Sequence, residues 1–197
     1  MAPRPKHLPD YKSPPVAEVA LSVQFGTLKN FKTAHAGSLW ELYRKNFMNF
    51  EEKQRLELSF ETFGTQGFQS LKPRIEMHSG PPSMRLWFVN QDDTQLIQFQ
   101  PDMFAHNWRK IGDKATYPRY EAIKKEFLAG IRKLKKFAKN EKLGEFVPNQ
   151  VEVSYINHIL SEKGESLPAA IGKIFKCWNN RRYNADLGEI ELSRFQS

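Results

Sequence analysis

The chain has 197 residues, 40% of them hydrophobic, which is enough for one sizeable core. Its formal net charge of +8 produces a field that attracts anions such as nucleic acid or acidic proteins. The single cysteine, Cys177, excludes an internal disulfide framework and a cysteine-built zinc site. No apolar run is long enough to span a membrane, and residues 1–15 lack the apolar segment of a secretory signal. We therefore expect a cytoplasmic protein with no membrane contact.

The chain is predicted to begin with an extended basic arm over residues 1–15, which contain five prolines. A strand follows over Val16–Phe25, where apolar residues alternate with polar or small ones. Ser38 and Glu41 have the spacing of a capping box, which predicts the start of a helix at Ser38. Apolar residues continue at helical spacing as far as Phe50, so the helix is predicted to extend that far.

The middle of the chain favours strands. Leu56–Phe63 alternates and predicts one strand, and Arg74–His78 predicts a shorter one. Met84–Asn90 and Gln95–Gln100 are two β-favouring runs joined by four polar residues, which predicts a hairpin. The alternation places Leu86, Phe88, Ile97 and Phe99 on one face of that hairpin. Pro101 is predicted to end the pairing because it has no N–H to donate.

The last part of the chain begins with the longest predicted helix, which starts near Pro118 and carries one apolar stripe. The stripe consists of Tyr120, Ile123, Phe127, Ile131, Leu134 and Ala138. A strand over Val151–Leu160, a short helix over Leu167–Trp178 and a terminal strand over Gly188–Phe195 follow.

The predicted order is therefore β-α-β-β-β-β-α-β followed by a short helix and a terminal strand. This order predicts an α+β fold, with a mostly antiparallel twisted sheet and two main helices packed on one face. The expected organisation is an arm over 1–15, an α+β domain over 16–160, and a C-terminal extension over 161–197. That extension is expected to pack on the sheet or to continue it.

Four segments occur in an order that is shared with a known family. They are PPVAEVALSVQF, a hairpin ending QLIQFQPDMFAHNW, a helix start YPRYEAIKKEF and a strand VEVSYINHI. Together they resemble a sporadically distributed prokaryotic family of uncharacterised proteins, over roughly residues 14–195. The resemblance implies a layout and no established activity, so no catalytic residue is carried over. Members of that family typically continue past ELSRF into a second α+β half. The resemblance therefore implies that this chain is a shortened form or that its last strand pairs elsewhere.

The long helix carries the strongest functional signal. Four of its cations lie within about 60° of one another at 3.6 residues per turn; they are Lys125, Arg132, Lys136 and Lys139. Aligned cations can contact phosphates, with an affinity that depends on salt. Arg181 and Arg182 precede Tyr183, and an aromatic residue beside arginines suits single-stranded nucleic acid. Three interpretations are open: a solvated basic surface, a site for RNA or single-stranded DNA, and a site for an acidic protein.

A polar and aromatic segment follows the predicted hairpin, at Phe104–Arg109. In one interpretation His106, Asn107, Trp108 and Arg109 line a groove, in which Trp108 and Arg109 stack on a base. In the other, Trp108 closes the end of the sheet and Asn107 bonds the backbone of a loop. We favour the second interpretation.

No catalytic constellation is evident in the sequence. Gly164 and Gly172 do not have the spacing of a phosphate-binding loop. The spacing of His78, His106 and His158 does not predict a metal site. We therefore expect no catalytic residues, no metal and no cofactor.

Two hypotheses remain for the function. The first is a non-catalytic interaction or regulatory module, which binds a protein partner or self-associates through an unpaired edge at Leu192–Phe195. The second is sequence-tolerant binding of RNA or single-stranded DNA through the basic helix face.

Overall fold

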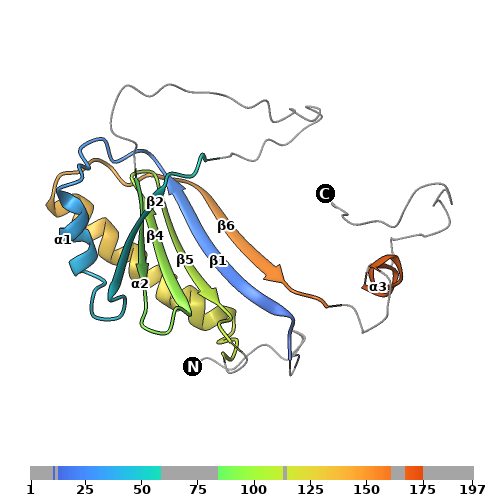
Figure 1. Ribbon diagram of the computed structural model, residues 1–197. Coiled ribbons are helices and arrows are strands. Elements are labelled where there is room, and N and C mark those ends of the chain that lie inside the picture. The colour runs from blue at the N-terminus through green and yellow to red at the C-terminus, as the bar shows by residue number, and fades with distance from the viewer. Residues whose placement is uncertain (1–10, 12, 59–83, 113–114, 161–166, 175–197) are drawn as a thin grey trace, which may run out of the picture. The chain divides into compact units, whose positions relative to one another are not determined.

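The computed structural model describes residue 11 and residues 13–58, 84–112, 115–160 and 167–174. The elements in chain order are β1 (Val16–Phe25), α1 (His35–Glu41), β2 (Asn49–Gln54), β3 (Met84–Val89), β4 (Gln95–Gln100), β5 (Met103–Arg109), α2 (Tyr120–Asn140), β6 (Pro148–Asn157) and α3 (Leu167–Ile174). The six strands form one antiparallel sheet in the order β2-β3-β4-β5-β1-β6. Helices α1 and α2 lie on the same face of this twisted sheet (Figure 1). The predicted α+β fold class is therefore confirmed.

The chain divides into two compact units, Met1–Asn157 and His158–Ser197. The sheet, α1 and α2 belong to the first unit, and α3 belongs to the second. Most of the predicted arm and the predicted terminal strand Gly188–Phe195 lie outside the described residues.

The predicted hairpin is present as β3 and β4. Leu86 pairs with Phe99 and Phe88 with Ile97, so the apolar face is the one predicted. Asn90 holds the turn: its Oδ1 accepts from the Gln95 N–H at 2.9 Å, and its Nδ2 donates to Thr94 Oγ1 at 3.1 Å. A side chain that bonds its own turn is one reason why Asn is common there.

No strand was predicted between Gln100 and the long helix, but the structure forms β5 there. Pro101 does end β4, but Pro101 and Asp102 form a two-residue turn, after which Met103 pairs with Gln100. The turn is held by two backbone bonds, from Phe25 N to the Asp102 carbonyl (2.9 Å) and from Leu28 N to the Pro101 carbonyl (2.8 Å). Pairing with both β4 and β1 then makes β5 a central strand.

Helix α1 is shorter than predicted and begins earlier. It starts after Ala34 with no side-chain cap, so the capping box predicted at Ser38 is wrong. The chain leaves the helix after Glu41 through a series of turns, and Trp40 Nε1 donates to the Phe47 carbonyl at 2.9 Å. The apolar residues after Glu41 were predicted to continue the helix. They do not, but the spacing correctly indicated burial, because Phe47 lies in the core.

Strand β2 lies earlier than the strand predicted over Leu56–Phe63. Residues 56–58 are outside any strand, while residues 59–63 and the predicted strand Arg74–His78 are outside the described part of the chain. The residues that were predicted to end the first helix form β2 instead. Phe50 is the apolar residue that fixes its register, because it lies opposite Phe88 with the two rings stacked at 5.7 Å.

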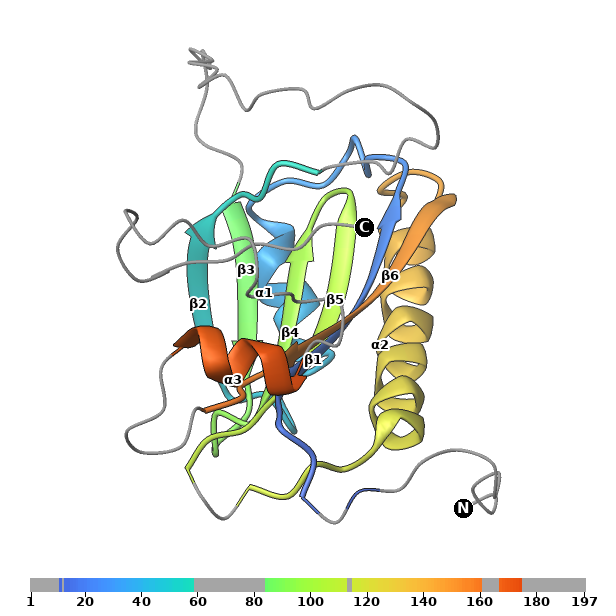
Figure 2. The same ribbon diagram turned by 90° about the vertical axis from the view of Figure 1, so that its right-hand side faces the viewer.

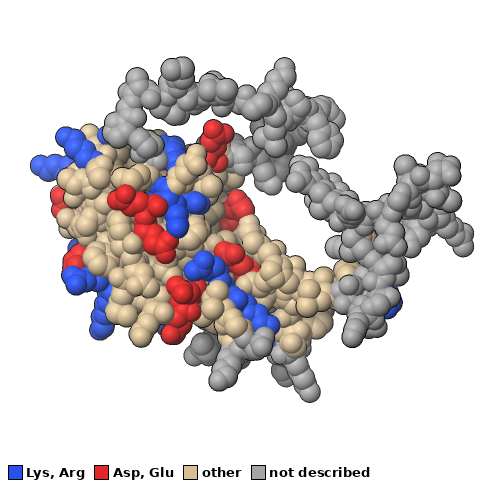
Figure 3. Space-filling model, in the orientation of Figure 1, with Lys and Arg blue, Asp and Glu red and all other residues tan. Residues whose placement is uncertain are grey.

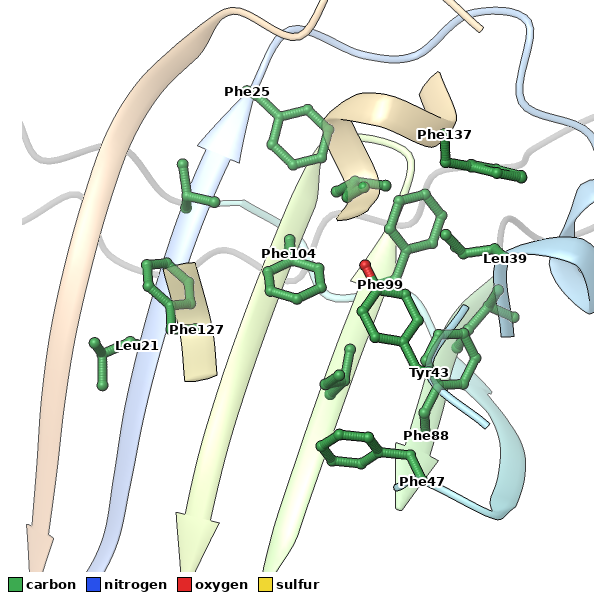
Figure 4. Close-up of a cluster of buried hydrophobic side chains, with 14 of the residues drawn as sticks. Leu21, Phe25, Leu39, Tyr43, Phe47, Phe88, Phe99, Phe104, Phe127 and Phe137 are labelled. Carbon is green, nitrogen blue, oxygen red and sulfur yellow. The ribbon is translucent and has the colours of Figure 1, made fainter. Parts of the chain in front are cut away.

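The core lies between the sheet and the two helices (Figure 4). Tyr43 stacks on Phe88 with ring centroids 5.7 Å apart, and Phe104 lies 6.1 Å from Phe127 of α2. Leu134 of α2 is fully buried. The helical stripe predicted for α2 therefore faces the sheet as expected, and this burial is the main stabilising contribution to such a layered fold.

The remaining boundaries differ by a few residues. Pro118 precedes α2 and its N-cap residue Arg119, rather than lying in the first turn. Strand β6 begins and ends three residues before the predicted Val151–Leu160. Helix α3 begins at Leu167 as predicted.

Candidate interaction surfaces

The four cations predicted on one face of α2 are all exposed. Lys125, Arg132, Lys136 and Lys139 lie on the side opposite the buried residues of that helix. None of the ion pairs found among the described residues involves them. Arg181 and Arg182, predicted to extend this surface, lie outside the described residues.

One end of this basic face borders a surface hollow of about 430 Å³. The hollow is lined by Lys135, Ala138, Lys139, Lys142, Gly144, Glu145 and Phe146. Lys135 Nζ lies 5.1 Å from the centroid of the Phe146 ring. The rim carries three lysines and one glutamate, so it is basic, as is the neighbouring face of α2.

The four residues of the predicted groove do not line a common surface. They alternate along β5, so His106 and Trp108 face the helices while Asn107 and Arg109 face the opposite side. His106, Asn107 and Trp108 are buried. Trp108 contacts Tyr117, which lies three residues before α2, with ring centroids 5.3 Å apart. Trp108 is buried on the central strand β5, one residue before that strand ends.

His106 is a core residue. It lies between Leu21 and Ile97 in the register of the sheet, and the Phe47 ring meets it edge-on with centroids 6.0 Å apart. Burial lowers its pKa to about 4, so the imidazole is neutral at neutral pH. Within the described residues, no group of three or more His, Cys, Asp or Glu side chains is placed to hold a metal ion.

Asn107 belongs to a row of polar side chains on the sheet face away from the helices. Arg85 Nη1 donates to Gln98 Oε1 (3.0 Å), and Gln98 Nε2 donates to Asn107 Oδ1 (3.0 Å). Asn107 Nδ2 donates in turn to Glu18 Oε1 (2.5 Å). The sequence predicted that Asn107 bonds loop backbone, and that prediction is wrong because its partners are side chains on neighbouring strands.

Three cations surround one indole on this same face. Lys53 Nζ lies 5.0 Å from the Trp87 ring centroid, and the Cζ atoms of Arg85 and Arg109 lie 5.2 Å and 5.9 Å from it. Such contacts stabilise by about 0.5–2 kcal/mol each, depending on exposure. Sequence reasoning missed this cluster. The sequence did contain part of the evidence, because the alternation along β3 places Arg85 and Trp87 on the same face. The strands that carry Lys53 and Arg109 were not predicted, so the other two cations could not be placed.

Strand β6 forms one edge of the sheet and is exposed along its length. Among the described strands its one neighbour is β1 (Figure 2). Val151, Val153 and Tyr155 share the face on which α1 and α2 lie, because they pair with the buried Val23, Leu21 and Val19. Their exposed fractions are 65%, 43% and 44%. Helix α2 packs mainly over β5 and β1, and the Tyr155 hydroxyl accepts from that of Tyr117 at 3.4 Å, so the row stays largely exposed.

The opposite edge, β2, has a different composition. Glu51, Glu52 and Lys53 put three charges into its six residues, and Lys53 pairs with Glu51 at 2.6 Å. Acidic and basic side chains are interspersed over the side of the molecule where β2 lies (Figure 3). In contrast, Glu152 is the one charged residue in the ten of β6. Charges on an edge strand discourage pairing with another chain. By this criterion β2 is protected and β6 is not.

The comparisons with known proteins add no family. No family model matches the chain, and a search of curated proteins and a search of solved structures each gave no match. In the described part of the chain, no helix is long and apolar enough to cross a membrane.

Proposed function

We propose that this chain is a non-catalytic interaction module that binds protein by strand addition at the outer edge of β6, where no described strand pairs. The observation that supports it is that β6 combines two features. It is an edge strand of the described sheet, and it carries an exposed apolar row of Val151, Val153 and Tyr155. Backbone hydrogen bonds supply affinity in strand addition, and alternate side chains supply specificity. The edge predicted from the sequence, Leu192–Phe195, lies outside the described residues, so the proposal now rests on β6.

The chemistry of the rest of the first unit is consistent with this role. The side chains of the row from Arg85 to Glu18 hydrogen-bond to one another, and His106 is buried against the Phe47 ring. Active sites instead present polar groups to a cleft where a substrate can reach them. The single cysteine of the chain fits a reducing compartment, and we place the module in the cytoplasm.

The test is the size of the native complex. The full chain, and the variant Val153→Lys, are expressed in the native cell and sized by gel filtration of the cleared lysate. We expect the chain to elute larger than a monomer and Val153→Lys to elute as a monomer, because a charge on the edge opposes pairing. Met48→Lys is the matched control, since Met48 is an exposed apolar residue beside β2. An unchanged elution of Val153→Lys would refute the role of β6.

A second candidate function, binding of RNA or single-stranded DNA, is favoured by the exposed face of α2. Lys125, Arg132, Lys136 and Lys139 present four cations with no ion-pair partner found in the described residues. Four phosphate contacts would give single-strand affinity a log–log salt slope near −0.7 for each contact, or roughly −3 in total.

A salt titration tests this second candidate. Binding of a mixed-sequence RNA and of single-stranded DNA is measured over a range of salt concentrations for the full chain and for the variant with all four cations changed to Glu. We expect the variant to lose affinity at low salt and to show a flattened slope. Changing Lys29 and Lys32 to Glu provides a control with exposed lysines elsewhere. Equal binding by the fourfold variant would exclude this face as the site.

A further inference from the structure

We infer that the occupant of the β6 edge is a second copy of this chain, paired antiparallel about a two-fold axis at Val153. This inference rests on the proposed function, because it names the partner at the same edge. A two-fold interface is self-complementary, so each residue must be compatible with the residue that the symmetry places opposite it. The sequence of β6 can therefore be tested against itself, one register at a time.

With the axis at Val153, every apolar residue of the exposed row meets another one. Val153 lies opposite its own copy, and Val151 lies opposite Tyr155 of the second copy. On the other face Glu152 lies opposite Ser154, whose hydroxyl already hydrogen-bonds Glu152 within one strand. In the dimer the Glu152 carboxylate would therefore again face a serine hydroxyl that can donate to it.

The neighbouring registers are less favourable. An axis at Glu152 would place two carboxylates directly opposite each other, and like charges in such a pair are destabilising. An axis at Ser154 would place Glu152 opposite Ile156 and Val151 opposite Asn157, which sets a charge against an apolar residue. Side-chain chemistry therefore selects Val153 from these three positions.

The pairing would join two six-stranded sheets into one continuous sheet, with α1 and α2 of both copies on the same face. The exposed row would be doubled into one apolar strip of six side chains. Removing this apolar surface from water would stabilise the association.

Charge sets the conditions under which the dimer is stable. Each copy carries a formal net charge of +8, and α2 contributes an exposed basic face. In the joined sheet the two β1 strands are three strand spacings apart, or about 14 Å. The α2 helices that pack over β1 and β5 are therefore separated by more than the Debye length of about 8 Å at physiological salt. The repulsion between the two basic helix faces is therefore largely screened at physiological salt and stronger at lower salt. We expect dimerisation to strengthen as salt rises, whereas nucleic-acid binding would weaken.

The first experiment measures mass. The purified full chain is examined at micromolar concentration by size-exclusion chromatography with light scattering, at about 0.05 M and about 0.5 M salt. We expect a dimer whose dissociation constant falls at the higher salt. Val153→Lys should be monomeric and Met48→Lys dimeric, with the folded state of both checked by thermal unfolding. A monomeric parent chain would overturn the inference.

The second experiment tests the register by disulfide formation under mild oxidation, in a background with Cys177→Ser. Val153→Cys should cross-link to its own copy, because the Cα atoms of directly opposite residues lie about 4.5–5.5 Å apart, which a disulfide can span. Val151→Cys and Tyr155→Cys should each cross-link poorly alone and efficiently when the two variants are mixed. Self-linking at another position in place of Val153 would overturn the assigned axis.

The two proposals fail in different ways. If Val153→Lys disrupts a complex in the lysate while the purified parent chain is monomeric, the edge binds another protein and self-association is wrong. If Val153→Lys leaves the lysate complex intact, strand addition at β6 is wrong as well.

Discussion

The guanidinium of Arg85 and the carboxylate of Glu18 are joined across four strands by the side chains of Gln98 and Asn107. Every bond in this row runs in the same direction, with the donor on the side of the cation and the acceptor on the side of the carboxylate. The charged ends therefore determine how both amides are oriented. Aligned dipoles strengthen one another in a buried network, which stabilises polar residues on a second buried face of the sheet.

Asn107→Asp should destabilise the protein by about 1–3 kcal/mol, since it replaces the donor to Glu18 with a second carboxylate beside it. The loss should shrink at acidic pH, where one of the two carboxyls takes up a proton. The free energy of unfolding in urea, measured at several pH values, checks this. Asn46→Asp, at an exposed turn position, should change stability little. Equal effects of the two variants would contradict the importance of the row.

Gly130→Ala should also destabilise the protein, although helix propensity alone would make alanine the more stable residue in α2. A Cβ at Gly130 would lie 2.6 Å from Cζ of Phe104, whose ring is buried in the centre of the sheet. Alanine would gain about 1 kcal/mol in helix propensity, but overpacking typically costs about 1–3 kcal/mol. We expect a net loss of up to about 2 kcal/mol in denaturant unfolding.

Gly37→Ala is the control for this prediction, because a Cβ there meets no atom within 4 Å and the residue lies in α1. It should be neutral or stabilising by up to about 1 kcal/mol. Gly130→Ala combined with Phe104→Leu should lose less than the two single losses added together, since the smaller side chain relieves the contact. If the stability losses of the two substitutions simply add, the contact with the Phe104 ring is not what makes alanine unfavourable at position 130.

Acid should weaken the fold through His106. Burial lowers its pKa from 6.5 to about 4, so between these values the unfolded chain binds a proton that the folded chain does not. The free energy of unfolding therefore falls as pH drops through this window, by about 3 kcal/mol in total, and the contribution is constant above it. His106→Leu should remove this component of the pH dependence, and His158→Gln, which removes an exposed histidine, should retain it. Parallel curves for all three proteins would contradict the assignment.

Much of the fold was predictable because three elements bury one face with a regular period. Strand β1, the hairpin of β3 and β4, and the stripe of α2 all follow that rule. Strand β5 was missed because Pro101 signals an end to pairing, and nothing local shows that the chain resumes pairing two residues later. Strand β2 was missed because the apolar spacing up to Phe50 predicted a helix and the pair Glu51 and Glu52 was taken as its end, although an edge strand tolerates such charges.

The candidate surfaces were predictable to different degrees. The basic face of α2 follows from helix geometry alone, so its residues were identified and are exposed. The β6 edge was not foreseen, because whether a strand lies at an edge depends on pairing between distant segments. The same limitation hid the cations around Trp87, which come from three strands.

Gln100→Leu should loosen the segment that follows β2. The Gln100 side chain is fully buried and imitates a strand neighbour, with Oε1 accepting from Leu56 N at 3.2 Å and Nε2 donating to the Leu56 carbonyl at 3.1 Å. Nε2 also donates to Asp102, which pairs with Arg55. Leucine has similar volume but no polar atoms, so these groups lose a partner at a cost of about 1–3 kcal/mol. We expect faster hydrogen exchange at the Leu56 amide together with lower stability. Gln54→Leu, at an exposed position of β2, should change neither, and protection of Leu56 in the Gln100 variant would show that other contacts hold the segment.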